Sequence, residues 1–394
     1  MIQNKFEHKN RDTKPVLAIC YDFDKTLSPE DMQAQGYIQS VDYDVDKFWK
    51  ESNKLADDND MDQNLAYMYM MVREAQGKIV LTKNTLKEYG AKVELFPGVE
   101  DWFKRISDYG ESHGVIIEHY IISSGLKEMI EGIKPAQEGV FERIYASSFY
   151  YDERGVPKWP AQVVNFTNKT QFLFRIEKGV LDVNDPAVND YYPSDKIRIP
   201  FRNIVYIGDS ETDIPCMKLV NVNGGYAIGV YNPYNLDKKN VYQMEINKRI
   251  KYFAPADYSE GQALDILIKK IIDRTVANEE LENIYYKNNN EAIEEDKKNS
   301  EDEKIKYKLL QNLKNSGSFA NTHAVINKMT NYHWNLDQKE KIFNIALNNR
   351  QVNLILTDYD VKEFYQGLLD NYLMPNNPDA EEIRRILSED IKGF

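Results

Sequence analysis

Three short apolar runs along the chain each stop at small or acidic residues and are followed by sequence with helical spacing. The runs cover residues 16–21, 115–123 and 204–208. Unbroken apolar runs of this length are typical of strands in a parallel sheet, because helices bury both faces of such a sheet. The pattern therefore predicts an α/β fold built on a parallel sheet.

Helical spacing of apolar residues also fills much of the chain between the first two runs. Segments 44–57 and 62–77 show it, Thr82 is placed to cap a further helix, and another helix is expected to start near Val99. We expect residues 30–95 to form a helical cap inserted into the sheet domain. An apolar stripe in this region either lines a substrate pocket or packs inside the cap; it consists of Tyr67, Met68, Met71 and Val72.

Two extended stretches flank the turn sequence at residues 152–155, which predicts a β-hairpin after the second run. Helical spacing resumes near residue 169, and a polar, proline-containing insertion precedes the third run. A last helix of the domain is expected where Leu264, Ile268 and Ile271 repeat at helical spacing. The sheet domain is therefore predicted to comprise residues 1–29 and 96–278.

The composition of the chain changes after this helix. Residues 279–304 are almost all charged or amide residues, which is typical of a flexible linker or a solvated helix. Residues 305–394 again contain apolar residues at helical spacing, in three to five segments. We therefore expect a separate, all-α module at the C-terminal end.

Charge and cysteine content narrow the class of protein. The 50 basic and 63 acidic residues give a formal net charge of −13, which argues against a nucleic-acid or anionic-membrane binder. Two cysteines, Cys20 and Cys216, are too few for a disulfide framework and suit a reducing compartment. No window approaches the ~20 apolar residues of a membrane helix, so a soluble, cytoplasmic protein is predicted.

The first apolar run ends in two carboxylates, Asp22 and Asp24, separated by one residue. Strand side chains alternate between faces, so residues two apart point the same way and their charges repel unless a cation lies between them. The second and third runs end in the sequences SSG and GDSETD. Because ligands of parallel sheets bind beyond the carboxyl ends of the strands, these three motifs are expected to meet in one crevice.

Together these motifs resemble those of the haloacid dehalogenase superfamily. DFDKTL resembles motif I of its phosphohydrolases, IISSG resembles motif II, and GDSETD resembles motif IV, over roughly residues 14–278. The resemblance is to phosphoserine-phosphatase-like members with a helical cap. It implies a Rossmann-like sheet domain and leaves the C-terminal helical module unmatched.

The resemblance also implies roles for the acidic residues. Asp22 would attack phosphorus and form an aspartyl-phosphate, while Asp24 would protonate the leaving group and later activate water. Mg²⁺ would be held by the Asp22 carboxylate, the Asp24 backbone carbonyl and the Asp209 carboxylate. Asp213 would orient a metal-bound water or another ligand, and Thr26 would close the motif I loop by hydrogen bonding.

The phosphate-binding residues are less sharply defined. Ser123 aligns with the motif II serine, and Ser124 is the alternative if the register differs by one residue. Lys169 is the preferred motif III lysine because it lies at a helix start, with Lys178 and then Lys158 as alternatives.

Three functions from different classes fit these residues. The leading one is a Mg²⁺-dependent phosphatase that hydrolyses a small phosphorylated metabolite and uses the cap to exclude water. A phosphomutase would keep the same nucleophile but shield the aspartyl-phosphate from water. Alternatively, the domain senses a phosphorylated ligand, while the C-terminal helices bind a protein partner or a second copy of the chain.

Overall fold

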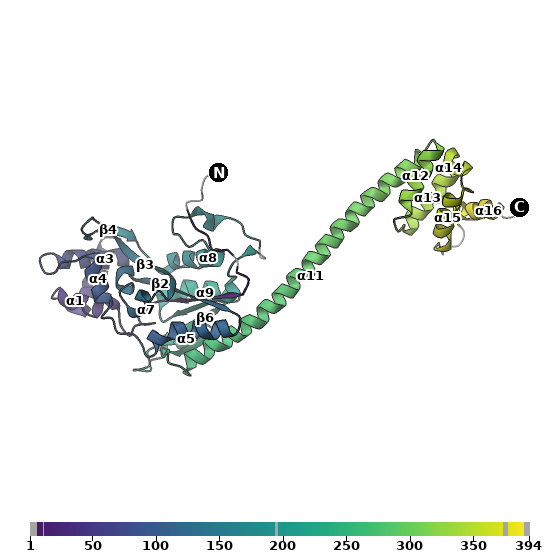
Figure 1. Ribbon diagram of the computed structural model, residues 1–394. Helices are drawn as coiled ribbons and strands as arrows, with labels where there is room; N and C mark the ends of the chain where they lie inside the picture. Colours follow the sequence, from purple (N-terminus) through teal and green to yellow (C-terminus); the bar gives the residue numbers. More distant parts are fainter. Residues whose placement is uncertain (1–5, 11, 194–195, 373–376, 390–394) are drawn as a thin grey trace. The chain divides into compact units, whose positions relative to one another are not determined.

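The computed structural model of the chain describes residues 6–10, 12–193, 196–372 and 377–389 (Figure 1). The chain divides into two compact units, of which the first ends at Asn283 and the second begins at Ile284. Among the helices in the described ranges, none combines the length and the apolar character needed to cross a membrane.

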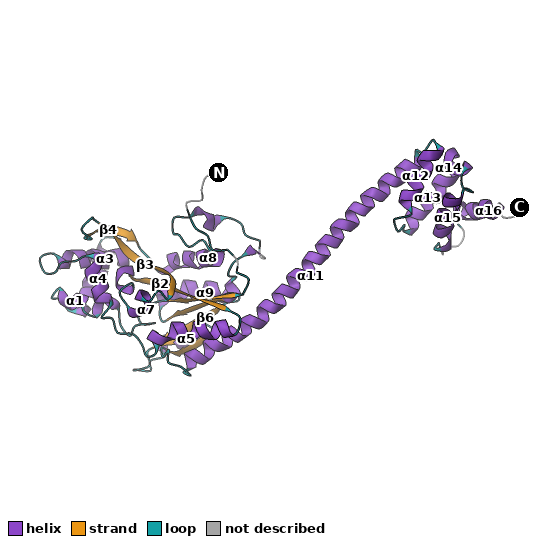
Figure 2. Cartoon of the chain, in the orientation of Figure 1, coloured by secondary structure: helices purple, strands orange, loops and turns teal. Residues whose placement is uncertain are grey.

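A seven-stranded sheet forms the centre of the first unit (Figure 2). The strands are β1 (Val16–Tyr21), β2 (Ile116–Leu126), β3 (Phe141–Tyr151), β4 (Pro157–Gln162), β5 (Ile204–Gly208), β6 (Tyr226–Tyr231) and β7 (Tyr252–Pro255). Their order is β4-β3-β2-β1-β5-β6-β7, and only the β3–β4 pair is antiparallel. The predicted α/β fold is confirmed, and the strands that carry the three motifs lie side by side.

Helices cover both faces of this sheet because the side chains of each strand alternate between them. Leu17, Ile19 and Tyr21 of β1 belong to one apolar core, whereas Val16, Ala18 and Cys20 belong to the other. The first core includes side chains of α5 (Val99–Ser112) and of the beginning of α11 (Ala263–Lys314). The second includes side chains of α8 (Thr170–Lys178), α9 (Ile214–Val222) and α10 (Lys239–Ile246).

Four helices lie between β1 and β2, within the range predicted for a cap. They are α1 (Tyr37–Ser40), α2 (Val45–Asp58), α3 (Gln63–Ala75) and α4 (Lys83–Gly90), preceded by the short 3₁₀ helix η1 (Met32–Ala34). The Thr82 hydroxyl accepts a hydrogen bond from the Thr85 N–H at 3.1 Å, so Thr82 caps α4 as predicted. Of the predicted stripe, Tyr67, Met68 and Met71 are buried and Val72 is partly buried. We call residues 30–95 the lid.

At two glycines, the backbone of the lid lies in direct contact with the backbone of the sheet domain. Gly90 is the last residue of α4, and a Cβ atom there would collide with the Met129 carbonyl in α6 (Lys127–Ile130). In the same way, a Cβ atom on Gly132 would collide with the Lys87 carbonyl of α4. Only glycine fits such a close approach without movement of the backbone.

The remaining short elements of the first unit connect these layers. They are α7 (Lys134–Gln137) and the 3₁₀ helices η2 (Phe166–Lys169), η3 (Pro186–Asn189), η5 (Phe201–Asn203) and η6 (Glu211–Asp213). The hairpin predicted around residues 152–155 is present, because β3 and β4 are antiparallel and the Gly155 N–H donates to the Asp152 carbonyl at 2.9 Å.

A buried imidazole supports the end of β1. His119 of β2 contacts the Tyr21 hydroxyl through Nδ1 at 3.0 Å and the Phe103 carbonyl through Nε2 at 3.2 Å. A carbonyl only accepts, so Nε2 carries the proton and Nδ1 accepts from Tyr21. The Tyr21 oxygen in turn accepts from Trp102 Nε1 at 2.8 Å. Burial lowers the pKa of His119 to about 4, against the opposing effects of the Phe103 carbonyl and the Glu118 charge.

Helix α11 runs without interruption from Ala263 to Lys314, so the charged residues 279–304 are helical. The division between the two compact units falls within this helix, after Asn283. The finer boundaries expected from the sequence, at residues 29, 95, 278 and 304, stay predictions.

The second unit contains the end of α11 and five further helices. These are α12 (Phe319–Met329), α13 (Leu336–Asn348), α14 (Arg350–Leu354), α15 (Tyr359–Asp370) and α16 (Pro378–Glu389). They enclose an apolar core of their own that includes Leu313, Met329, Phe343, Tyr365 and Ile383.

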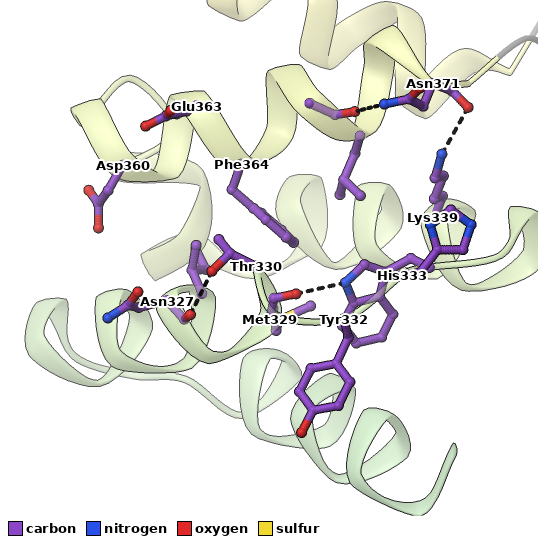
Figure 3. A pocket seen from close by; sticks show the side chains of 14 residues that line it. Asn327, Met329, Thr330, Tyr332, His333, Lys339, Asp360, Glu363, Phe364 and Asn371 are labelled. Atoms are coloured by element: carbon purple, nitrogen blue, oxygen red, sulfur yellow. Dashed lines mark hydrogen bonds between the residues drawn. The ribbon is translucent and has the colours of Figure 1, made fainter. Parts of the chain in front are cut away.

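A cavity of about 550 Å³ in the second unit is lined by residues of α12, α13, α15 and the segment after α12 (Figure 3). Asn371 follows the last residue of α15. The buried Lys339 donates to the Asn371 carbonyl at 2.8 Å. A lysine in this position stabilises the C-terminal end of a helix. Lys339 therefore has a structural role, and the lining includes no candidate from the sequence motifs.

Candidate active site

The first candidate residue, Asp22, follows β1 directly and is held by its neighbour strand. Its N–H donates to the Ile207 carbonyl of β5 at 2.9 Å, and only 5% of the residue is exposed. Lys169 is fully buried at the end of η2, with its ammonium 3.2 Å from Asp22 Oδ1 and 2.8 Å from Asp213 Oδ1. The two carboxylates outweigh the effect of burial and raise the pKa of Lys169, so the lysine is a fixed positive charge.

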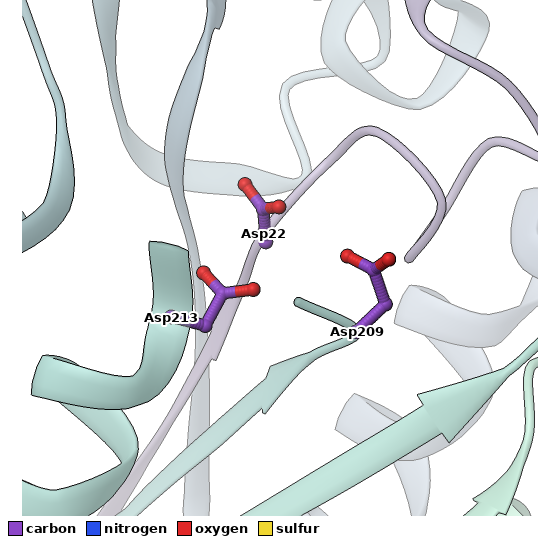
Figure 4. A group of neighbouring side chains, drawn as sticks. All are labelled: Asp22, Asp209 and Asp213. Atoms are coloured by element: carbon purple, nitrogen blue, oxygen red, sulfur yellow. The ribbon is translucent and has the colours of Figure 1, made fainter. Parts of the chain in front are cut away.

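Three carboxylates gather beside this lysine (Figure 4). Asp22 comes from the end of β1, Asp209 from the residue after β5, and Asp213 from η6, and one oxygen of each lies within 4.8 Å of the others. Burial and the Asp213 charge raise the pKa of Asp22 to about 6, although the Lys169 charge lowers it. Burial, followed by the Asp213 and Asp22 charges, raises the pKa of Asp209 well above its usual range.

The three carboxylates differ in the hydrogen-bond donors that they have. Asp213 Oδ1 accepts from Lys169 and from the Tyr206 hydroxyl at 2.7 Å, and the Ser210 N–H approaches its other oxygen at 3.4 Å. The Asp209 carboxylate has no hydrogen-bond donor among the described residues. A partly exposed carboxylate that has no protein donor and lies beside a second carboxylate fits a cation with oxygen ligands. This donor set therefore fits a magnesium ion held mainly by Asp22 and Asp209.

Asp24 lies two residues after Asp22, the candidate nucleophile, and a residue of the lid holds its carboxylate. Its Oδ1 accepts from the Met32 N–H at 2.8 Å. Burial raises the pKa of Asp24 well above its usual range, and the charges of Asp31 and Asp22 add to this effect. The second carboxylate oxygen lies close to Gly125, since a Cβ atom there would be 3.1 Å from Oδ2. Asp24 thus lies between the motif I loop and the motif II loop.

Thr26 closes the motif I loop through its backbone rather than its hydroxyl. Its N–H donates to the Phe23 carbonyl at 3.2 Å, and its own carbonyl accepts from the Tyr258 hydroxyl at 2.9 Å. The buried Thr26 Oγ1 has no hydrogen-bond partner among the described residues.

The neighbouring Lys25 has a left-handed backbone, with φ at +59°, which is uncommon for a residue with a side chain. Its ammonium pairs with Asp31 at 3.1 Å. Lys25 and Asp209 border a polar cavity of about 200 Å³, whose other side includes Asn232 and Asn240. The Lys25 side chain is 49% exposed, and no sequence pattern indicates its place beside this cavity.

The serines of motif II lie at the end of β2. Ser123 is fully buried, and its Oγ accepts from the Gly125 N–H at 3.0 Å, which leaves its hydroxyl proton available. The Ser124 Oγ is buried and has no hydrogen-bond partner in the described part of the chain. Among the described residues, therefore, neither hydroxyl donates its proton to a protein acceptor.

The three lysines weighed for motif III lie in different places. Lys169 contacts Asp22, as described above. Lys178 donates to the Val188 and Asp190 carbonyls at 2.7 and 2.8 Å, and Lys158 pairs with Asp152 at 3.2 Å near the hairpin turn. The structure thus brings Lys169 together with Asp22 and Asp213. It places the two alternative lysines elsewhere.

Two contributors to the site were missed by the sequence reading. Tyr206 donates to Asp213, and Met32 donates from its backbone to Asp24. Tyr206 resembles any core residue of a buried strand. Every residue except proline has a backbone N–H, so the identity of Met32 does not indicate its contact with Asp24. Neither contact has a sequence signal that could have identified it.

Comparison with known proteins shows what the chain is similar to. The model of the haloacid dehalogenase-like hydrolase family matches residues 19–218, just over half of the 394 residues. An uncharacterised protein of Borreliella burgdorferi is 29% identical over 276 residues, which cover 63% of this chain and 94% of that protein.

Several solved structures are also similar to the chain. A HAD family hydrolase from Salmonella enterica serovar Typhi has a TM-score of 0.44 and 16% identity, over 66% of this chain and 72% of that chain. A phospho-aspartyl intermediate analogue of phosphoserine phosphatase has a TM-score of 0.39 and 15% identity, over 65% and 99% of the two chains. A probable phosphoserine phosphatase from Vibrio cholerae has a TM-score of 0.44 and 11% identity, over 68% and 67%.

Proposed function

The chain belongs to the haloacid dehalogenase-like hydrolase family, whose model matches residues 19–218, and on this premise we propose that it is a Mg²⁺-dependent phosphomonoester hydrolase. Its nucleophile would be Asp22, and its substrate a small phosphorylated metabolite. The observation that carries the proposal is the buried Lys169 ammonium between Asp22 and Asp213, with the unsatisfied Asp209 carboxylate beside them. A structural ion pair would need one carboxylate, whereas a phosphoryl-transfer site needs several carboxylates with a fixed cation.

Asp22 would attack the phosphoryl group of the substrate. Lys169 holds its Oδ1 at 3.2 Å, which leaves Oδ2 as the attacking oxygen. The O–P bond to Asp22 forms as the bond between phosphorus and the substrate oxygen breaks, which gives an aspartyl-phosphate and an alcohol. Lys169 also offsets the negative charge of the phosphoryl oxygens, together with donors from Ser123 and Ser124.

Asp24 would transfer the protons of both half-reactions. Its Oδ1 is occupied by the Met32 N–H, so Oδ2 is the oxygen that would give a proton to the leaving alcohol. The same oxygen would then accept a proton from the water that attacks the aspartyl-phosphate. Because Met32 belongs to the lid, the Asp24 carboxylate is oriented by the element that would cover the leaving group.

The Asp22 and Asp209 carboxylates and the Asp24 backbone carbonyl would hold Mg²⁺. Bound there, the ion would supply positive charge that offsets the carboxylates and polarises the phosphoryl group. Asp213, whose Oδ1 already accepts from Lys169 and Tyr206, would orient its neighbours rather than bind.

The test is phosphate release from a panel of small phosphomonoesters with Mg²⁺ present. We expect turnover of at least one member by the wild type, and no detectable turnover by Asp22→Asn, which is similar in shape but is a poor nucleophile. Asp101→Asn on the exposed surface of α5 is the matched control and should keep wild-type rates. Beryllofluoride, which mimics a phosphoryl group on an aspartate, should stabilise the wild type and not Asp22→Asn. A Mg²⁺-loaded wild type that releases no phosphate and does not respond to beryllofluoride would contradict the proposal.

A further inference from the structure

The lid helix α3 is joined to both phosphate-binding loops by a closed series of hydrogen bonds. The Tyr67 hydroxyl donates to the Ser124 carbonyl at 2.9 Å, and Ser147 Oγ of β3 donates to the same carbonyl at 3.1 Å. Ser147 Oγ accepts from the Val164 N–H at 3.1 Å. The Val164 carbonyl accepts from Asn64 Nδ2 at 2.7 Å, which returns the series to α3. We call this set of bonds the α3 ring.

The α3 ring passes through the two segments that carry the candidate phosphate donors. Ser124 is itself one candidate and follows the other, Ser123. Val164 lies five positions before Lys169 in the same connecting segment. Tyr67 is 4% exposed, and Ser147 and Val164 are fully buried. In a buried environment such bonds are stronger and fix their partners more tightly than in water.

A second contact strengthens the link between α3 and the Lys169 segment. Asp62 caps α3, since its Oδ1 accepts from the Asn64 N–H at 2.8 Å. Its other oxygen accepts from Asn165 Nδ2 at 3.1 Å. The first turn of α3 is therefore bound to two consecutive residues of the segment that leads to the catalytic lysine.

The bond made by Tyr67 differs from that of a comparable buried tyrosine of the lid. The Tyr37 hydroxyl donates to the Met71 carbonyl at 2.5 Å, so its bond lies entirely within the lid. Tyr67 donates instead to a residue of the sheet domain, at a carbonyl flanked by the two candidate phosphate-binding hydroxyls. Lid packing alone would be served equally by a phenylalanine at this position, because the ring already packs against Trp49 at 5.9 Å between centroids.

We propose that Tyr67 is a positioning residue of the reaction, which holds the Ser123–Ser124 segment and, through the α3 ring, the Lys169 segment in their phosphate-binding geometry when the lid is closed. The inference rests on the proposed phosphatase function and deepens it. Without the hydroxyl, the Ser124 carbonyl keeps only one of its two donors, and the lid no longer fixes the serines against the lysine. Small displacements of such groups lower the rate because the phosphoryl group is no longer held in line.

The experiment compares Tyr67→Phe with Tyr37→Phe in the full-length protein. Both variants remove one buried hydroxyl from the lid, and both keep the ring. With a phosphomonoester that the wild type hydrolyses, Tyr67→Phe should lower kcat about 10-fold and weaken inhibition by inorganic phosphate about as much. Tyr37→Phe should lose stability to a similar degree but keep kcat within about twofold. Unchanged kcat in Tyr67→Phe, or equal losses in both variants, would overturn the proposal.

Amide hydrogen exchange provides a readout that does not depend on turnover. Exchange in residues 121–126 and 163–169 should be faster in Tyr67→Phe than in the wild type or in Tyr37→Phe. If the wild type hydrolyses no phosphomonoester, the proposed function fails, and this measurement alone decides the inference. Equal exchange in the three proteins would then overturn it. Should Tyr67→Phe not fold, Ser147→Ala opens the same ring from the sheet domain and should give the same 10-fold loss; wild-type kcat in that variant would count against the proposal.

Discussion

The buried imidazole of His119 makes the first unit sensitive to acid, and its contribution to stability follows from its hydrogen bonds. The neutral ring satisfies both nitrogens, since Nε2 donates to Phe103 and Nδ1 accepts from Tyr21. Protonation would place a second N–H against the Tyr21 oxygen, which already accepts from Trp102. The folded protein therefore resists protonation at this position.

The size of this effect follows from the two pKa values. The pKa of His119 is about 4 in the folded protein and 6.5 ordinarily. A pKa that is lowered on folding means that the unfolded chain binds the proton more tightly, so the stability is fully present above pH 6.5 and is lost as the pH falls towards 4. At about 1.4 kcal/mol for each pH unit, the loss between these limits is about 3 kcal/mol.

The substitution that tests this effect is His119→Gln. The glutamine amide can still donate to the Phe103 carbonyl but does not titrate. Other buried groups change the pH profile of both proteins equally, so the informative quantity is the wild-type stability minus the variant stability. This difference should fall by about 3 kcal/mol from pH 7 to pH 4, which corresponds to about 5 °C in melting temperature for a unit of this size. Calorimetry of the full chain at several pH values measures it, because separate transitions can be assigned to the two units.

His113→Gln is the matched control, because His113 is an exposed residue at the end of α5. Its difference from the wild type should change by less than about 0.5 kcal/mol over the same range, as for other surface substitutions. A flat difference for His119→Gln, or one that rises towards acid, would refute the reasoning about the imidazole.

Three further predictions concern single side chains. Lys169→Met should destabilise the first unit by about 3–5 kcal/mol, because it leaves two buried carboxylates uncompensated, whereas Lys158→Met should cost less than about 1 kcal/mol; equal melting temperatures of the two variants would contradict this. Asp24→Asn should lower kcat for phosphomonoesters by about 10²–10⁴-fold, and near-normal turnover would exclude its proton-transfer role. Phe343→Ala should destabilise the second unit by about 3–5 kcal/mol in calorimetry, and a loss no larger than that of the exposed Leu354→Ala would show that the apolar core of this unit is wrongly described.

The sequence predicted those parts of the fold whose signals are local. The strands at 16–21 and 204–208 have the predicted bounds, because each is a fully buried apolar run that ends at a motif. The cap of α4 at Thr82 and the hairpin around 152–155 were likewise predicted from short, strongly restrictive sequences. Strand β7 was not predicted, because only four residues form it and its pairing with β6 is set by the sheet rather than by its own residues.

The site could be predicted only as far as its residues lie in short motifs. Asp22 and Asp209 were identified from their positions after strands, and the structure brings them together. Tyr67 and Tyr206 act through partners set by tertiary packing, which residue type does not reveal. Such contributions depend on the folded arrangement and cannot be inferred from a single sequence.

The backbone contacts at Gly90 and Gly132 restrict how substrate can reach the crevice. A lid that lies directly on the sheet domain at α4 and α6 cannot lift away as a whole without breaking its closest contacts. Opening the lid would therefore break either this backbone contact or the bonds of the α3 ring. An alanine at either glycine would force the backbones of α4 and α6 apart and so change how the lid lies on the sheet domain.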